Sequence, residues 1–302
     1  MPDGRIAVAG LTKHYKEVRA VDGLSFEVEP GRVTGFLGPN GAGKTTTLRM
    51  ILNLVRPTAG TATIGGVRYA DLPDPVGTVG AVLEASAAHK GRTARNHLRI
   101  LCRAAGLPDR RADEVLDIVG LSTAASRKFK GYSLGMKQRL GIAAALIGDP
   151  RVLILDEPAN GLDPEGIRWM RQLLQSLAAE GRTVLVSSHL LSEMEILAED
   201  VVIVAAGRLV TQGPVRKVIA SLGGSGRTLV RTPDAAALTA ALGDGATISP
   251  GQDGDLWVTG LDAVAIGEAA HRAGVVLHQL TSDSPDLEGV FLEPTKGKAD
   301  IR

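Results

Sequence analysis

The chain has 302 residues and a formal net charge of +1, and 44% of its residues are apolar. This apolar share excludes wholesale disorder, and the near-neutral charge gives no reason to expect a nucleic-acid surface. The single cysteine, Cys102, excludes an intrachain disulfide and favours a reducing compartment. The N-terminal residues lack the apolar stretch of a secretory signal, and no apolar run approaches the roughly 18 residues of a membrane helix. We therefore expect a cytoplasmic protein whose membrane role, if it has one, requires a partner.

The segment from residue 1 to residue 220 alternates between predicted strands and helices. Residues 4–30 alternate in the manner of strands, Val33–Leu37 is a short buried strand, and a helix is expected from about Gly43 to Leu54. The later predicted elements are, in chain order, a strand and turn (Gly60–Val67), helical spacing over 93–120 with a break at 106–108, a helix from about Met136 to Ile147, the strand Val152–Leu155, the amphipathic helix Ile167–Glu180, and the strands Thr183–Ser187 and Val201–Ala205. This order predicts an α/β layered core.

A glycine-rich linker, residues 221–226, separates this domain from a smaller pattern. The smaller pattern contains the strand Thr228–Arg231, the helix Ala235–Leu242, the strands Ala246–Ser249 and Leu256–Thr259, the helix Ala263–Ala273 and the strand Val275–Leu280. The order βαββαβ predicts a small C-terminal α+β domain over residues 227–292, ferredoxin-like in type. A short helix, Asp286–Leu292, ends this domain, and a polar tail over 293–302 follows.

A glycine-rich loop between a predicted strand and a predicted helix satisfies the pattern GxxxxGK[ST]. Its residues are Gly38, Pro39, Asn40, Gly41, Ala42, Gly43, Lys44, Thr45 and Thr46. Glycines let consecutive backbone N–H groups point inward around a β-phosphate, and the helix that follows adds the positive end of its dipole. We expect Lys44 to reach the β- and γ-phosphate oxygens and the Thr45 hydroxyl to ligate magnesium. The alternative is a glycine turn with a surface lysine.

An acidic pair, Asp156 and Glu157, follows the apolar strand Val152–Leu155. A buried strand in this position would deliver Asp156 to a metal ion, usually through water, and Glu157 would orient the attacking water. An acidic pair at the end of an apolar strand is weak evidence when taken alone. Together with the phosphate loop it predicts a nucleotide triphosphatase.

Residues 132–139, with the sequence YSLGMKQR, resemble the signature motif of the ABC ATPase family. The likeness extends from about residue 4 to residue 220. It implies a P-loop NTPase fold with a RecA-like sheet, an antiparallel β subdomain and a helical subdomain over about 88–140. It also implies a head-to-tail homodimer in which Ser133 and Gly135 of each chain contact the ATP of the other. Ser133 is at the same time a suitable N-cap for the helix that follows.

Further positions match motifs of the same family. Tyr15 precedes the loop at the distance of the aromatic residue that stacks on adenine, although a tyrosine at a strand edge is ordinary. Asp163 ends the segment ANGLD, which is similar to the D-loop that lies across the dimer interface. His189 occupies the position of the switch histidine and is expected to contact the γ-phosphate, although a histidine at a strand end is usually structural.

The chain departs from the family pattern in two places. Glu84 replaces a common glutamine; its carboxylate could bind magnesium through water but would add negative charge beside the phosphates, and an exposed loop glutamate is the alternative. In the signature, Leu134 replaces a glycine and Met136 replaces a glutamine. Because Ser133 and Gly135 are retained, we expect altered affinity or communication rather than loss of hydrolysis.

Glu84, the region of Glu157 and the C-terminal extension resemble the antibiotic and multidrug exporter branch, which includes daunorubicin-resistance ATPases. Asp286–Leu292 is similar to a short motif of that branch, and an amphipathic helix explains the same residues equally well. The resemblance implies an ATP- and Mg²⁺-dependent ATPase subunit, peripheral on the inner face of the cell membrane, with a separate integral membrane permease and no nucleic-acid partner. The alternatives are a soluble ABC ATPase acting on ribosomes or DNA, the ATPase of an importer, and a small-molecule kinase.

Overall fold

The computed structural model describes residues 3–83, 88–222, 227–251 and 255–283. The chain divides into two compact units, with the boundary between Val215 and Arg216. Helix α8 (Val215–Leu222) begins at this boundary and includes the first residues of the predicted linker, whereas residues 223–226 lie outside the described residues. The domain limits 1–220 and 227–292 stay a prediction. None of the described helices combines the length and the apolar character that a helix needs to cross a bilayer.

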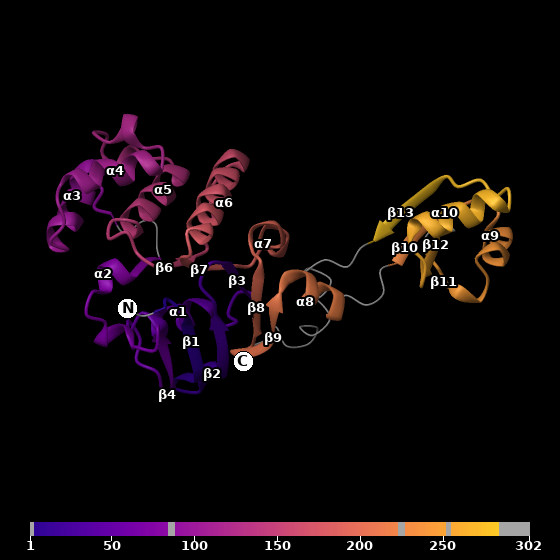
Figure 1. Ribbon diagram of the computed structural model, residues 1–302, viewed down its shortest axis with the longest axis horizontal. Coiled ribbons are helices and arrows are strands. Elements are labelled where there is room, and N and C mark those ends of the chain that lie inside the picture. Colours follow the sequence, from indigo (N-terminus) through magenta and orange to yellow (C-terminus); the bar gives the residue numbers. More distant parts are fainter. Residues whose placement is uncertain (1–2, 84–87, 223–226, 252–254, 284–302) are drawn as a thin grey trace. The chain divides into compact units, whose positions relative to one another are not determined.

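The first unit contains a six-stranded sheet with the strand order β5-β6-β7-β3-β8-β9 (Figure 1). Its strands are β3 (Val33–Leu37), β5 (Val79–Val82), β6 (Val152–Asp156), β7 (Thr183–Ser188), β8 (Asp200–Ala205) and β9 (Arg208–Pro214). Neighbouring strands are parallel except for β8 and β9, which are antiparallel. Every residue of β3 and β7 is buried, as expected where both faces of a parallel sheet are covered.

A second, antiparallel sheet with the order β2-β1-β4 packs in the same unit. Its strands are β1 (Ile6–Tyr15), β2 (Val18–Val28) and β4 (Ala59–Ile64). The two sheets share one apolar core in which Phe26 of β2 and Phe36 of β3 stack with ring centroids 5.2 Å apart. Helix α1 (Lys44–Ile51) contacts β1, β2, β4 and β6, so its first residue is held in a fixed place between the sheets.

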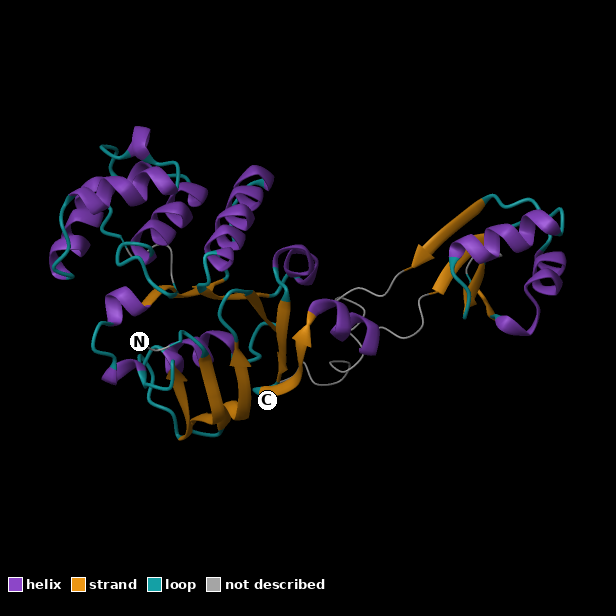
Figure 2. Ribbon diagram, in the orientation of Figure 1, coloured by secondary structure: helices purple, strands orange, loops and turns teal. Residues whose placement is uncertain are grey.

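A group of helices, at the upper left of Figure 2, belongs to the first unit, and in the chain it follows β5. It consists of α3 (Ala94–Ala104), α4 (Arg110–Ile118) and α5 (Leu134–Ala145), which contact one another. The predicted break at 106–108 separates α3 from α4, and Gly106 there has a φ of +70°. Further α-helices among the described residues of this unit are α2 (Pro75–Thr78), α6 (Pro164–Ala179) and α7 (Leu191–Leu197). Strands β5 and β9 and helices α2, α7 and α8 are elements that the sequence pattern did not predict.

Some predicted helix ends differ from the observed ones. Helix α1 ends at Ile51 rather than Leu54, because Asn53 adopts a left-handed backbone conformation with a φ of +55°. Helix α6 begins three residues before the predicted start at Ile167, because Asp163 caps the helix and Pro164 occupies its first position. Helix α5 begins at Leu134 rather than Met136, since the Ser133 side chain accepts a hydrogen bond from the Met136 N–H.

The second unit contains an antiparallel sheet with the order β11-β12-β10-β13. Its elements are β10 (Arg227–Arg231), α9 (Ala235–Leu242), β11 (Thr247–Pro250), β12 (Leu256–Thr259), α10 (Ala263–Arg272) and β13 (Gln279–Asp283). Val230, Leu238, Val258 and Ile266 form the centre of its separate core. The observed order is βαββαβ, while the ferredoxin-like assignment stays a prediction. The predicted helix Asp286–Leu292 lies outside the described residues.

The predicted strand Val275–Leu280 is wrong in its bounds, since β13 begins at Gln279. The segment after α10 instead completes the end of that helix. The Val275 N–H donates to the Ala270 carbonyl oxygen at 2.9 Å, and Gly274 has a φ of +67°. This turn follows the common glycine-terminated helix end, so it delays the strand by several residues.

A bidentate ion pair between Arg231 and Asp255 makes the stability of the second unit depend on pH. Arg231 donates from Nε and Nη2 to the two carboxylate oxygens of Asp255, at 2.6 and 2.8 Å. These hydrogen bonds hold the pKa of Asp255 below its ordinary value of 3.8. A carboxyl group whose pKa is lower in the folded state stabilises the fold at pH values above its unfolded-state pKa. This stabilisation is lost as the pH falls through the folded-state pKa.

We therefore expect Arg231→Gln to lower the stability of the second unit at neutral pH. The difference from the parent protein should shrink as the pH falls from 3.8 through the lower pKa of folded Asp255, because the carboxyl group then becomes protonated in the folded parent as well. Urea unfolding at pH 7, 5 and 3 measures this, with Trp257 fluorescence followed in the full-length Trp169→Phe background. A difference in unfolding midpoint that is the same at all three pH values would contradict the assignment.

Candidate functional site

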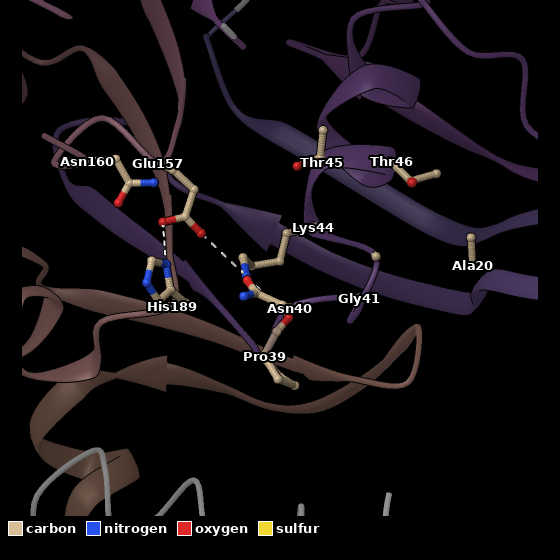
Figure 3. A pocket seen from close by; sticks show the side chains of 11 residues that line it. Ala20, Pro39, Asn40, Gly41, Lys44, Thr45, Thr46, Glu157, Asn160 and His189 are labelled. Atoms are coloured by element: carbon tan, nitrogen blue, oxygen red, sulfur yellow. Dashed lines mark hydrogen bonds and ion pairs between the residues drawn. The ribbon is translucent and has the colours of Figure 1, made fainter. Parts of the chain in front are cut away.

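A cavity of about 370 Å³ lies beside the glycine-rich loop (Figure 3). Strands β3, β6 and β7 are parallel neighbours, so their carboxyl ends share one edge of the sheet, where ligands of α/β proteins bind. The loop follows β3, the acidic pair ends β6, and His189 follows β7. The described lining residues are Ala20, Pro39, Asn40, Gly41, Gly43, Lys44, Thr45, Thr46, Glu157, Asn160 and His189.

Close packing against neighbouring strands sets the shape of the loop. A Cβ atom on Gly43, whose φ is +94°, would lie 2.4 Å from the carbonyl oxygen of Ala20. A Cβ atom on Gly38 would lie 2.5 Å from the carbonyl oxygen of Val204. Only glycine allows this approach of backbone to backbone. Gly38, which packs against Val204, and the buried Ala42 are not among the residues that line the cavity.

Lys44 brings a buried positive charge to the cavity. Its side chain is 6% exposed, and Nζ donates to the carbonyl oxygens of Gly38 at 2.6 Å and Pro39 at 3.3 Å. Nζ also lies 3.5 Å from Glu157 Oε1. An ammonium group that is buried without such partners carries a large desolvation penalty. These contacts hold Nζ within the loop.

Glu157 lies between Lys44 and His189, as Figure 3 shows. Its Oε2 atom is 2.8 Å from His189 Nδ1. Its φ of +49° is in the left-handed region, which residues other than glycine rarely adopt. The Glu157 N–H donates to the carbonyl oxygen of Ser187 at 3.2 Å and to Ser187 Oγ at 3.0 Å. These bonds stabilise the bend that follows β6.

Thr45 and Asp156 place a hydroxyl and a carboxylate side by side. Thr45 Oγ1 donates to Asp156 Oδ2 at 2.7 Å. The described residues contain no group of three or more His, Cys, Asp or Glu side chains arranged to hold a metal ion. Oxygen donors of this kind fit Mg²⁺, which takes few protein ligands and completes its shell with water and phosphate oxygens. The pair therefore fits Mg²⁺ that arrives with a nucleotide.

Glu193 of α7 is a titratable group whose pKa is affected by the charges of two site residues, His189 and Glu157. Burial raises its pKa above the ordinary value, and the charges of His189 and Arg171 oppose the rise. Its Oε2 atom is buried and has no hydrogen-bond partner within the described part of the chain. A raised carboxyl pKa means that this group reduces the stability of the fold as the pH rises above 4.5.

Several predicted site residues are not among those that line the cavity. Tyr15 is 47% exposed, and Lys13 Nζ lies 5.0 Å from the centroid of its ring. Ser133 and Gly135 lie at the start of α5. Asp163 caps α6, accepting a hydrogen bond from the Gly166 N–H at 2.8 Å. Their roles toward a nucleotide stay predictions.

Glu84, the proposed indirect magnesium ligand, lies outside the described residues. Three other residues at the site were not predicted. Ala20 lines the cavity and lies beside Gly43. An alanine side chain has no chemical group that would identify it as a site residue from the sequence. Asn160 lies within the D-loop segment, which was predicted only as a segment. Ser187 was recognised as part of a strand, and its contacts with Glu157 emerge only from the pairing of β6 with β7.

Comparisons of the sequence with known families and proteins match both units. A family model described as ABC transporter matches residues 21–160, and one described as a domain of unknown function matches residues 226–288. The bacitracin transport ATP-binding protein of Bacillus licheniformis is 45% identical over 69% of this chain and 69% of its own length. The daunorubicin/doxorubicin resistance ATP-binding protein of Streptomyces peucetius is 38% identical over 74% of this chain and 69% of its own length.

Solved structures give the same family. An ATP-binding subunit of an ABC transporter superposes with a TM-score of 0.65 and 30% identity, covering 72% of this chain and 93% of that chain. A dimeric ATP-binding cassette in a post-hydrolysis state, bound to ADP and Pi, superposes with a TM-score of 0.64 and 25% identity. That match covers 69% of this chain and 98% of the cassette.

The close packing at Gly43 predicts a specific effect of adding one methyl group. Gly43→Ala should weaken ATP binding by about tenfold or more, equivalent to about 1.4 kcal/mol, because the new Cβ would displace the loop from the Ala20 carbonyl. Gly181→Ala is the matched control, since Gly181 has a φ of +92° but open space around its Cβ position. Titration with a fluorescent ATP analogue compares the two variants. An equal loss in both would show that general destabilisation of the fold, not the close approach at the loop, weakens ATP binding.

Proposed function

This chain belongs to the ABC transporter family, and from that membership we propose that it is the subunit that binds and hydrolyses ATP to drive the export of antibiotics or other drugs. The observation that carries the catalytic part is the cluster of Lys44, Glu157 and His189 around one cavity, with Glu157 in contact with both other side chains. The bacitracin and daunorubicin/doxorubicin relatives support the class of exported substrate.

Each residue of the cluster has a distinct part in the proposed reaction. Lys44 exchanges its carbonyl and carboxylate partners for the β- and γ-phosphate oxygens of ATP. Glu157 orients a water molecule for in-line attack on the γ-phosphorus, which yields ADP and phosphate. His189 contacts the transferred phosphoryl group and is positioned for this by its hydrogen bond to Glu157. Tyr15 supplies a stacking surface for adenine.

Thr45 and Asp156 are the proposed holders of Mg²⁺, with Asp156 acting through water and Glu84 as a further indirect ligand. The bound ion would supply positive charge that stabilises the phosphate oxygens during transfer. The short contact between the Thr45 hydroxyl and the Asp156 carboxylate supports this assignment, because it places a second oxygen donor directly beside Thr45, although only Thr45 is among the residues that line the cavity.

A second copy of the chain completes the proposed site. Ser133 and Gly135 lie at the start of α5 but are not among the cavity-lining residues of their own chain. Backbone N–H groups at a helix start bind phosphate well. In the proposed homodimer, this helix start and Asp163 of each chain face the ATP held by the other. The similar solved cassette that is dimeric supports the arrangement.

The transport path is proposed to belong to a separate integral membrane permease. The described residues contain no helix fitted to cross a membrane, and the curated relatives are named as ATP-binding proteins of transport or resistance systems. The helical group α3–α5 is the proposed contact with the permease, on the cytoplasmic face of the membrane. No nucleic-acid partner is proposed.

Glu157→Gln is expected to separate ATP binding from hydrolysis. The amide retains the size of the side chain but cannot act as the carboxylate, so kcat should fall by about 100-fold or more. ATP should remain bound between two chains and trap a dimer on a sizing column with MgATP. The double variant Lys44→Ala, Glu157→Gln is the control and should elute as a monomer, because it lacks the phosphate-binding ammonium. Elution of Glu157→Gln as a monomer with saturating MgATP would contradict the sandwich dimer.

Purification of the tagged chain from its native membranes in mild detergent is expected to recover an integral membrane protein in stoichiometric amount. The chain should leave the membrane when the permease gene is deleted, since it has no described membrane-spanning helix of its own. Mass spectrometry of the purified complex identifies the partner. Recovery of ribosomal proteins or DNA-bound complexes in its place would favour a soluble ABC ATPase.

A further inference from the structure

Ser187 connects the two acidic residues of the site. The residue is 0% exposed and lies opposite Asp156 in the parallel pairing of β6 with β7. Its Oγ atom donates to Asp156 Oδ1 and accepts from the Glu157 N–H at 3.0 Å. One buried hydroxyl therefore contacts two consecutive residues that have different proposed roles.

We propose that Ser187 is a positioning residue that fixes the Asp156 carboxylate and the Glu157 backbone relative to each other and to the phosphate loop. The inference rests on the proposed ATPase function, to which it adds a residue that acts through others. Ser187 itself touches neither nucleotide nor water in this scheme.

The direction of each hydrogen bond is fixed by the groups involved. A serine hydroxyl has one proton to donate and two lone pairs to accept with. An ionised carboxylate only accepts and a backbone N–H only donates. The proton of Ser187 must therefore point to Asp156 while a lone pair faces the Glu157 N–H. Each bond holds the hydroxyl in the orientation that the other needs.

The orientation of the Asp156 carboxylate depends on this hydroxyl. Oδ2 is held by Thr45 of α1, and Oδ1 is held by Ser187 of β7. The terminal torsion of an aspartate is soft when nothing holds its oxygens. Loss of the Ser187 hydroxyl would free one oxygen and let the carboxylate turn away from the position in which it would hold Mg²⁺ through water.

The bend at Glu157 depends on the same residue. Its left-handed backbone is held by N–H bonds to both the carbonyl oxygen and Oγ of Ser187. The bend directs the side chain to Lys44 and His189. Removal of Oγ would leave one of these two bonds, so the carboxylate of Glu157 should lose part of its alignment.

A purely structural role for Ser187 makes a different prediction, and the same strand provides the comparison. Thr183 begins β7, is also 0% exposed, and donates its hydroxyl to the carbonyl oxygen of Gly4 at 2.8 Å. Thr183→Val removes this buried hydroxyl with little change of shape and touches neither acidic residue. It reports what the loss of a buried hydrogen bond in β7 does to the fold alone.

The test compares full-length Ser187→Ala, Ser187→Thr and Thr183→Val with the parent chain. The measurements are kcat, KM for ATP, the Mg²⁺ concentration for half-maximal rate, and the Kd for ATP with and without Mg²⁺. Ser187→Ala should lower kcat by about tenfold or more, the usual effect of losing a residue that orients a metal ligand. It should also raise the Mg²⁺ requirement and weaken the Mg²⁺-dependent gain in ATP affinity, while metal-free ATP binding stays unchanged.

Ser187→Thr retains the hydroxyl and should restore most of the rate. Thr183→Val should lower the melting temperature without moving kcat or the Mg²⁺ requirement. Effects of Ser187→Ala that match those of Thr183→Val, or an equal loss of ATP affinity with and without Mg²⁺, would overturn the inference. If Ser187→Ala does not fold, Ser187→Cys, which has a similar size but is only a weak donor, is judged by the same criteria.

Measurements on the parent chain distinguish failure of this inference from failure of the proposed function. A parent that neither hydrolyses ATP nor binds it more tightly with Mg²⁺ would overturn the proposed function, and the Ser187 inference with it. An active parent whose kcat and Mg²⁺ requirement are unaffected by Ser187→Ala would overturn the inference alone.

Discussion

The ion pair between Lys44 Nζ and Glu157 Oε1, 3.5 Å apart, joins the two halves of the candidate site. Lys44 begins α1 directly after the glycine-rich loop, and Glu157 follows β6 much later in the chain. They meet because β3, β7 and β6 are consecutive parallel strands of one sheet, whose carboxyl ends share an edge. The contacts of Thr45 with Asp156 and of Glu157 with His189 depend on the same edge. Without that strand order, the loop and the acidic pair would have no common cavity.

The chemistry of this edge could be predicted from sequence because each half has a local pattern. Phosphate binding requires glycines at a fixed spacing before Lys44, and metal binding requires an acidic residue such as Asp156 at the end of an apolar strand. Both patterns are visible in a short stretch of sequence. Ser187 and Ala20 have no such pattern. Ser187 is one of two adjacent serines in an apolar strand, and only its register opposite Asp156 distinguishes it. Ala20 matters through its carbonyl beside Gly43, which depends on how two distant segments pack.

The fold could likewise be predicted only in part from the sequence. Apolar periodicity identified most strands and helices but not their ends, which depend on side chains such as Asp163 or on backbone turns such as the one at Gly274. Ser133 and Gly135 show a different kind of gap. The sequence marks them strongly, yet their own chain gives them no place in the cavity. Their proposed role requires a second chain, whose ATP they would contact.

In the proposed dimer, each ATP site contains Lys44 of one chain and Ser133 of the other. Lys44→Ala and Ser133→Arg should each be inactive alone, and mixing the two variants tests this shared site. A mixed dimer would contain one site in which both Lys44 and Ser133 are intact and one site in which both are replaced. Half of the dimers formed at random from an equimolar mixture are mixed, so about a quarter of the parent ATPase rate per chain should return if the sites act independently. No recovery on mixing, with both variants folded and dimerisation shown to occur, would contradict the shared site.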